Sequence, residues 1–166
     1  MRALNTVAGM LERRVDVLLV CSAGGHLLQL RLLDDAWCGL SHAWVTHARE
    51  DARSLLAGEP VVYAHEPTTR NVKNLVRNAV LAWRVLGRSR PAVILTTGAG
   101  LAVPFAWLGG ARGARVVYVE SLTRVERPSL SCRLVRPVVD RIYVQWPELV
   151  RELPEARYVG SVVGDL

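Results

Sequence analysis

Short apolar runs alternate with longer amphipathic segments along the chain. Most of these runs are of strand length, contain β-branched residues, and are bounded by glycine, proline or polar residues. Strands are predicted at 15–21, 43–46, 61–63, 92–96, 115–119, 141–144 and 157–159. Nearly continuous apolar runs are typical of parallel strands that are buried on both faces.

The segments between these strands predict helices. They cover 26–38, 50–56, 71–88, 101–108, 130–138 and 147–153. Strands that alternate with helices predict an α/β fold with a parallel, doubly wound sheet. We therefore expect one Rossmann-like domain over residues 15–166.

The longest predicted helix, 71–88, has apolar residues at helical spacing. We expect its apolar side to pack on the sheet, with Trp83 in the core, and its basic side to face solvent. The alternative is a basic amphipathic helix that faces anionic lipid headgroups. The apolar positions are Val72, Leu75, Val76, Ala79, Val80, Trp83 and Leu86, and the basic positions are Lys73, Arg77, Arg84 and Arg88.

Residues 1–14 stand outside the alternating pattern. Leu4, Val7, Ala8 and Leu11 lie on one side of a helix. This segment is either a short amphipathic helix that lies on a membrane or a helix that docks on the domain or frays. No segment reaches the ~18–20 apolar residues that cross a bilayer, so we expect no membrane-spanning helix.

Composition and charge narrow the class of partner. The chain of 166 residues is 51% hydrophobic, so it can form a core, and its formal net charge is +6. Nearly all of this charge is arginine, which suits phosphates or anionic lipid. We expect no nucleic-acid partner, because the arginines are dispersed and no zinc-finger spacing or RNA-binding aromatic motif is present. The three cysteines are far apart, so we expect no metal site.

Three polar or glycine-rich loops follow predicted strands, at 22–26, 96–100 and 120–124. In a doubly wound sheet, ligands bind beyond the carboxyl ends of the strands. These three loops are therefore the candidate site.

The first loop favours an anion. Gly24 and Gly25 follow Ser22 and precede a predicted helix, where backbone N–H groups and the helix dipole attract negative charge. A pyrophosphate-linked ligand fits this loop, and a tight turn that binds nothing is the alternative. The third glycine of a dinucleotide fingerprint and the G-x-x-x-x-G-K-[ST] motif are both absent, which argues against dinucleotide binding and NTP hydrolysis.

Two titratable side chains lie in these loops. His26 can hydrogen-bond a phosphate or act as a base near neutral pH, or it can cap and pack the turn. Glu120 ends a buried strand, where it can accept the proton of a sugar hydroxyl or pair with Arg124 or Arg127. The residues alone leave these alternatives open.

Six segments in a fixed order carry a resemblance to a known family. They are 21–30 (CSAGGHLLQL), 44–46 (WVT), 70–75 (RNVKNL), 97–104 (TGAGLAVP), 117–121 (VYVES) and 140–149 (DRIYVQWPEL). The chain resembles the anchor subunit of the two-chain N-acetylglucosaminyltransferase of lipid-linked oligosaccharide synthesis. It is more similar still to bacterial relatives of that subunit in capsule and exopolysaccharide assembly. The resemblance runs from residue 15 to about residue 163.

The resemblance implies the N-terminal half of a GT-B glycosyltransferase, working as a subunit that is inactive alone. A separate donor-binding chain would hold most of the UDP-sugar site, and no cofactor is expected beyond that donor substrate. This chain would recruit the partner and bind a polyprenyl-diphosphate-linked saccharide, to which a hexosyl or N-acetylglucosaminyl unit is transferred.

Roles for individual residues follow from the same resemblance. In a subunit of this kind, His26 or Glu120 is expected to assist the deprotonation of the acceptor hydroxyl. Contact with the acceptor diphosphate is expected at Ser22, Gly24, Gly25, Thr97, Gly98, Gly100 and Ser121. Contact with the partner chain is expected at Gln145, Trp146 and Glu148.

Eukaryotic members of this family carry an N-terminal transmembrane helix, whereas this sequence has only the short segment 1–14. We therefore expect peripheral attachment to the cytoplasmic face of a membrane. Two other functions stay open at this point. One is a non-catalytic membrane scaffold for a catalytic partner, and the other is an unrelated Rossmann-like nucleotide-binding protein.

Overall fold

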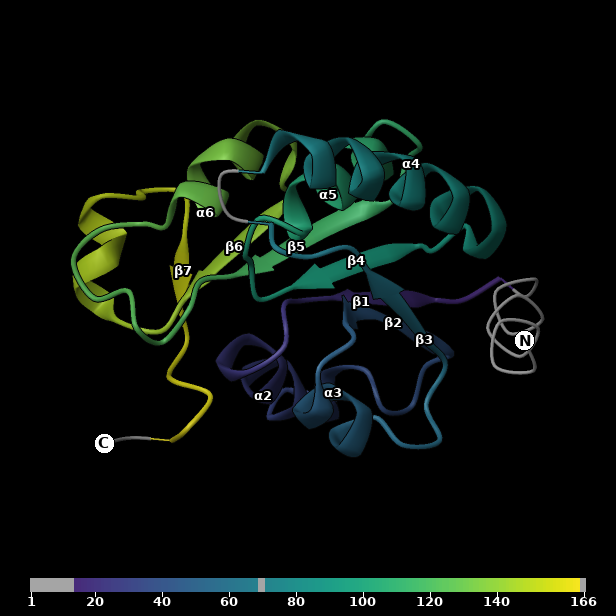
Figure 1. Cartoon of the computed structure of the whole chain (residues 1–166). Coiled ribbons are helices and arrows are strands. Elements are labelled where there is room, and N and C mark those ends of the chain that lie inside the picture. Colours follow the sequence, from purple (N-terminus) through teal and green to yellow (C-terminus); the bar gives the residue numbers. More distant parts are fainter. Residues whose placement is uncertain (1–13, 69–70, 165–166) are drawn as a thin grey trace.

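Residues 14–68 and 71–164 are described by a computed structural model. Seven parallel strands form one sheet in the order β3-β2-β1-β4-β5-β6-β7 (Figure 1). The strands are β1 (Val17–Val20), β2 (His42–His47), β3 (Val61–Ala64), β4 (Val93–Thr96), β5 (Arg115–Val119), β6 (Arg141–Val144) and β7 (Arg157–Tyr158). The predicted strands and the predicted α/β class with a parallel sheet are confirmed.

Helices connect the strands and cover both faces of the sheet. Figure 1 shows α2 and α3 on one face, and α4, α5 and α6 on the other. The helices are α2 (Gly25–Arg31), α3 (Glu50–Leu55), α4 (Val72–Ser89), α5 (Ala102–Gly110) and α6 (Leu130–Val135). Three short 3-10 helices complete the connections: η1 (Asp34–Ala36), η2 (Arg136–Val138) and η3 (Pro147–Arg151).

The predicted helix 26–38 is shorter than expected. α2 ends at Arg31 and η1 follows it. The chain turns there and buries Trp37, whose indole N–H donates to the carbonyl of Leu30 at 3.2 Å. Burial of this large aromatic side chain and satisfaction of a free helix-end carbonyl both favour the turn over a longer helix.

Side chains that alternate along each strand explain the continuous apolar runs. In β1, Leu18 and Val20 belong to the core under α4 and α5, whereas Val17 and Leu19 belong to the core on the α2 side. A third cluster lies among β5, β6 and α6. Both faces of β1 are therefore buried, as expected for a parallel strand inside a sheet.

The prediction that the apolar side of α4 packs on the sheet is wrong. Val72, Val76, Val80 and Trp83 are exposed, and Trp83 has 60% of its surface accessible. Leu75 is also exposed and Leu86 alone of the predicted larger apolar residues is buried. The residues that α4 buries are Asn74, Asn78, Ala82, Val85, Leu86 and Ser89.

Two buried asparagines give the physical reason for this rotation of α4. Asn78 accepts the backbone N–H of His65 and donates to the carbonyl of His65, both at 2.9 Å. Asn74 donates to the carbonyl of Pro67 at 3.0 Å. The helix thus satisfies the backbone that follows β3, and buried polar groups demand such partners.

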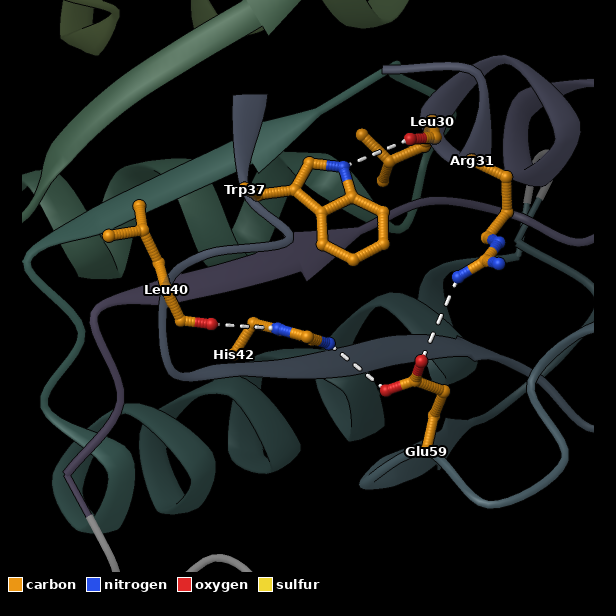
Figure 2. Close-up of polar contacts among 6 residues, drawn as sticks. All are labelled: Leu30, Arg31, Trp37, Leu40, His42 and Glu59. Carbon is orange, nitrogen blue, oxygen red and sulfur yellow. Dashed lines mark hydrogen bonds and ion pairs between the residues drawn. The ribbon is translucent and has the colours of Figure 1, made fainter. Parts of the chain in front are cut away.

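A polar cluster lies at the amino ends of β2 and β3 (Figure 2). The ring of His42 lies between the Leu40 carbonyl, 2.9 Å from Nδ1, and the Glu59 carboxylate, 3.0 Å from Nε2. Arg31 also pairs with Glu59 at 3.7 Å. The amino ends of parallel strands are the edge opposite the predicted site, so His42 is not part of that site.

Among the described helices, none is both long enough and apolar enough to cross a bilayer. The amphipathic segment predicted at 1–14 lies outside the described residues, apart from the exposed Arg14. Its contact with a membrane stays a prediction.

Candidate functional site

The three predicted loops meet at one edge of the sheet. β4 pairs in parallel with β1 on one side and with β5 on the other. The segments that follow these three strands therefore emerge side by side at the carboxyl edge, where ligands of such sheets bind.

His26 and Thr97 join the first two loops. Nδ1 of His26 lies 2.7 Å from the Thr97 carbonyl oxygen, and the Thr97 hydroxyl donates to the His26 carbonyl at 2.8 Å. Because a carbonyl oxygen only accepts, Nδ1 carries the proton of the neutral ring and Nε2 keeps its lone pair. In the part of the chain that the structure describes, no side chain or backbone group hydrogen-bonds to Nε2.

The pKa of His26 lies below the usual histidine value of 6.5, chiefly because the ring is largely desolvated. The hydrogen bond to Thr97 and the charge of Glu120 oppose this shift, and the charge of Arg124 adds to it. The ring is therefore neutral at physiological pH, which is the state that a general base requires.

Asp51, which was not predicted as a site residue, contacts the first loop. Its Oδ2 accepts the backbone N–H of Gly24 at 2.6 Å. Asp51 lies in the first turn of α3, and the parallel pairing of β1 with β2 brings the two connections together. The carboxylate thus takes up the backbone N–H of Gly24, which an anion would otherwise bind, and its negative charge repels an anion nearby. The backbone N–H of Gly24 is therefore already used within the protein, and Gly25 is the exposed glycine of this loop beside it.

Gly98 holds the second loop against β5. Its φ of 100° is left-handed, a conformation that glycine adopts without strain. A Cβ atom at this position would collide with the Tyr118 hydroxyl. That hydroxyl lies 3.1 and 3.0 Å from the hydroxyls of Ser129 and Ser131, so the glycine permits a close approach between two connections of the sheet.

Glu120 is fully buried, and its carboxylate binds backbone groups of its own connection. One oxygen accepts the N–H of Ser121 and the other accepts the N–H of Ser129, both at 2.8 Å. Neither Arg124 nor Arg127 pairs with it among the ion pairs of the described residues. The geometry favours a role in positioning this loop over direct contact with an acceptor hydroxyl.

Exposure divides the predicted diphosphate-contacting residues into two groups. Thr97, Gly98 and Ser121 are buried, so they shape the loops from within. The residues with accessible surface are Ser22, Gly24, Gly25 and Gly100.

Gln29 and Gln145 link the site to the segment predicted to contact a partner. Oε1 of Gln29 accepts the N–H of Leu122 at 2.7 Å and the side-chain amide of Gln145 at 2.8 Å. The same amide of Gln145 donates to the Glu120 carbonyl at 2.9 Å, and its oxygen accepts the N–H of Val162 at 3.2 Å. Gln145 is 2% exposed, so its side chain serves the interior and offers no surface to a partner.

Trp146 and Glu148 are accessible, and partner contact stays a prediction for these two. The indole N–H of Trp146 donates to the Leu122 carbonyl at 2.6 Å, and the residue is partly exposed. A cavity of about 220 Å³ lies between these residues, Tyr158 and Ser161.

A larger apolar groove of about 500 Å³ lies on the α2 side of the sheet, over β4, β5 and β6. Its floor includes Leu95, Val117 and Tyr143, and Trp37 forms one wall. The same face of β1, β2 and β3 is covered by α2 and α3 (Figure 1). No group of three His, Cys, Asp or Glu side chains that could hold a metal occurs within residues 14–68 and 71–164.

Comparison with known sequences identifies related proteins. The family profile described as "Oligosaccharide biosynthesis protein Alg14 like" matches residues 61–162. The UDP-N-acetylglucosamine transferase subunit ALG14 of Rattus norvegicus is 39% identical over 183 residues, which cover 92% of this chain and 85% of that protein. The subunit of the same name from Eremothecium gossypii is 39% identical over 104 residues, covering 55% of this chain and 46% of that one. The chain spans less than half the length of the fungal relatives that it matches.

Two solved structures have the same fold at low sequence identity. UDP-N-acetylglucosamine 2-epimerase from Rickettsia bellii has a TM-score of 0.69 at 13% identity, over 89% of this chain and 45% of that chain. MurG from Acinetobacter baumannii has a TM-score of 0.66 at 14% identity, over 80% of this chain and 42% of that chain. These likenesses confirm the predicted α/β fold of a Rossmann-like domain, which matches less than half of each of the two larger chains.

Proposed function

This chain belongs to the family of Alg14-like oligosaccharide biosynthesis proteins, and we propose that it is the acceptor-side subunit of a two-chain UDP-sugar glycosyltransferase. The acceptor is a saccharide linked to a polyprenyl diphosphate, and the donor is held mainly by a partner chain. The names of the relatives support this, because they describe subunits of a UDP-N-acetylglucosamine transferase. The complex works peripherally at the cytoplasmic face of a membrane.

The state of His26 is the observation that carries the catalytic part of this proposal. Its ring is neutral, its Nδ1–H is fixed by the Thr97 carbonyl, and Nε2 keeps a lone pair at the carboxyl edge of the sheet. Nε2 takes the proton of the acceptor hydroxyl while that oxygen bonds to the anomeric carbon and the bond to UDP breaks. The Thr97 carbonyl then stabilises the imidazolium that forms.

Glu120 acts in this reaction as a positioning residue. Its carboxylate fixes the backbone at Ser121 and Ser129, and its charge favours the protonated form of His26. The diphosphate of the acceptor contacts the accessible part of the glycine loops, at Ser22, Gly25 and Gly100. No metal is needed for this contact, since backbone N–H groups and arginine offset phosphate charge.

The test is reconstitution with the donor-binding chain. The complex is expected to transfer sugar from UDP-N-acetylglucosamine to a short polyprenyl-diphosphate saccharide, whereas each chain alone transfers none. Full activity of this chain by itself would rule out the two-chain division of labour. Tight binding of a nucleotide to the isolated chain would instead indicate an unrelated nucleotide-binding protein.

A pair of histidine variants separates catalysis from scaffolding. His26→Ala in the assembled complex is expected to lower kcat by about 10²–10⁴-fold, the usual contribution of a general base. His65→Ala is the matched control, because His65 is exposed at the end of β3. Unchanged turnover of the His26→Ala complex would show that this chain is a non-catalytic scaffold.

A further inference from the structure

The outward surface of α4, α5 and α6 is apolar over three neighbouring helices. We name it the outer helical face and define it by Val72, Val76, Val80 and Trp83 of α4, Trp107 of α5 and Leu130 of α6. All six side chains are exposed, Val72 and Leu130 by more than 70%. Single exposed apolar residues are ordinary on protein surfaces, but a contiguous set marks an interaction site.

α4 itself carries three separate stripes. At 3.6 residues per turn, the buried residues around Asn78 and Val85 occupy one side of the helix. The exposed apolar residues occupy a second side, and Lys73, Arg77, Arg84 and Arg88 occupy the third. The apolar stripe is therefore bordered on one side by the rest of the protein and on the other by a row of cations.

Two contacts join the helices along the outer helical face. The guanidinium of Arg112, just after α5, lies 3.9 Å from the centre of the Trp83 ring and donates to the Trp83 carbonyl at 2.9 Å. The indole N–H of Trp107 donates to the carbonyl of Leu134 in α6 at 3.0 Å. Both tryptophans thus have their polar contacts satisfied while their rings stay accessible.

The charge around the α4 and α5 part of this face has one sign. Between Glu66 and Glu120 the sequence contains no acidic residue. The same stretch contains Arg70, Lys73, Arg77, Arg84, Arg88, Arg90, Arg112 and Arg115. Tryptophan, aliphatic residues and flanking cations are the combination that binds a bilayer surface.

We propose that the outer helical face binds the surface of a bilayer that contains anionic lipid. The aliphatic and tryptophan side chains enter the headgroup region, and the cationic stripe of α4 contacts lipid phosphates. This inference names the membrane-contacting surface of the proposed function and rests on it for the lipid-linked acceptor. α4 and α6 both begin at the carboxyl edge of the sheet, so Val72 and Leu130 place the bilayer beside the candidate site.

The test is vesicle co-sedimentation of the full chain. We compare vesicles of phosphatidylcholine mixed with phosphatidylglycerol against vesicles of phosphatidylcholine alone. The chain is expected to bind the mixed vesicles, and the triple variant Val76→Ser, Val80→Ser, Trp83→Ser is expected to bind at least roughly tenfold more weakly. The matched control is Leu32→Ser, Leu40→Ser, Leu55→Ser, which removes three leucines of similar exposure from outside the outer helical face and is expected to bind like the parent.

A spectroscopic measurement covers the case in which the triple variant fails to fold. Lipids brominated near the headgroup quench tryptophan that enters the bilayer, and Trp37 and Trp44 are too buried to be reached. Quenching is expected in the parent chain and is expected to decrease in Trp83→Phe, which keeps an aromatic ring at the same place.

The proposal is overturned if the parent chain does not bind mixed vesicles, or if the folded triple variant binds them as well as the parent does. It is also overturned if the control variant loses as much binding as the triple variant, or if quenching in Trp83→Phe equals that in the parent. If the triple variant still binds vesicles but no longer co-purifies with the donor-binding chain, the outer helical face is assigned to a protein partner instead. Vesicle binding through this face by a chain that supports no sugar transfer would refute the proposed function and leave this inference standing.

Discussion

At the scale of the residue, the protonation of His26 is coupled to the backbone of a neighbouring loop. The Thr97 carbonyl selects the tautomer, and burial keeps the ring neutral. A base of this kind stays active as pH falls until the proton finally binds Nε2. Under the proposed mechanism, the pH dependence of the assembled complex is therefore expected to report on this ring.

We predict that the activity of the complex falls on the acidic side only at a pH below the usual pKa of histidine. The pKa of His26 in the folded chain lies below 6.5, so kcat/KM is expected to stay level from neutral pH to below 6.5 and to fall only beyond that. In His26→Gln the remaining activity is expected to lack this limb. An acidic limb that persists unchanged in His26→Gln would assign it to another group.

The lowered pKa of His26 also predicts how the stability of the folded chain depends on pH. The unfolded chain binds a proton on this histidine near pH 6.5, and the folded chain binds it only at lower pH. The free energy of unfolding is therefore expected to decrease as pH falls below about 6.5. Urea denaturation of the parent and of His26→Gln over this range measures the difference, and parallel pH profiles would contradict it.

Gly98 and Gly113 allow steric collision to be separated from backbone strain. Both have positive φ, but a Cβ at Gly98 meets the Tyr118 hydroxyl, whereas nothing lies within 4 Å of one at Gly113. Gly113→Ala is expected to cost about 1–2 kcal/mol from strain. Gly98→Ala is expected to cost more, about 3 kcal/mol in total. Urea denaturation measures both, and equal losses would show that the Tyr118 contact yields easily.

At this scale the sequence predicts which loops form the site, but not which side chains hydrogen-bond to the backbone of each loop. Glycines and strand ends identify the loops of His26 and Gly98, because a buried strand followed by glycine has few other interpretations. The carboxylate of Asp51 on Gly24, and the amides of Gln29 and Gln145 between loops, depend on side-chain directions that spacing does not specify. The expected pairing of the consecutive strands β1 and β2 was the available signal for Asp51, because it brings the segment after β2 close to the loop after β1.

At the scale of the element, α4 reverses the usual relation between polarity and burial. Asn78 is buried and hydrogen-bonded to both backbone groups of His65, while Val76 is 58% exposed. Helical periodicity identifies an apolar stripe correctly but does not say what covers it. The prediction for 71–88 was wrong because the sheet contact is chosen by backbone groups after β3 as well as by apolar area.

We predict that stability follows burial in α4 and not polarity. Asn78→Ala removes a buried side chain that bonds the N–H and the carbonyl of His65, and it is expected to cost about 1–3 kcal/mol. Val76→Ala removes exposed apolar atoms and is expected to change stability by less than about 0.5 kcal/mol. Thermal or urea denaturation of the two variants checks this, and a larger loss in Val76→Ala would place that side chain in the core.

At the scale of the whole molecule, the order of strands follows from rules that act on sequence. Alternating strands and helices with parallel pairing leave few topologies, and the observed sheet is one of them. Right-handed connections also place α5 and α6, which follow β4 and β5, on the face opposite α2 (Figure 1). The α2 side of β4, β5 and β6 is therefore left without a helix from these connections, and the apolar groove lies there.

Association with the proposed donor-binding chain can be tested at Glu148. This residue is exposed in η3 beside a small cavity, so Glu148→Lys is expected to slow association by up to about fivefold without loss of stability. Glu152→Lys makes the same change of charge just after η3 and is expected to have little effect. Surface plasmon resonance at two salt concentrations measures both, and identical rates for the two variants would remove Glu148 from the interface.

The position of β1 in the sheet has a consequence for the chain while it is being synthesised. Val17 pairs with His42 on one side and with Val93 on the other. The first pairing can form early, but the second must await residues that leave the ribosome much later. Until then one edge of an entirely apolar strand is open, and open edges invite pairing with other chains. The interval between the emergence of β2 and the emergence of β4 from the ribosome is therefore the one in which the nascent protein is expected to need a chaperone most.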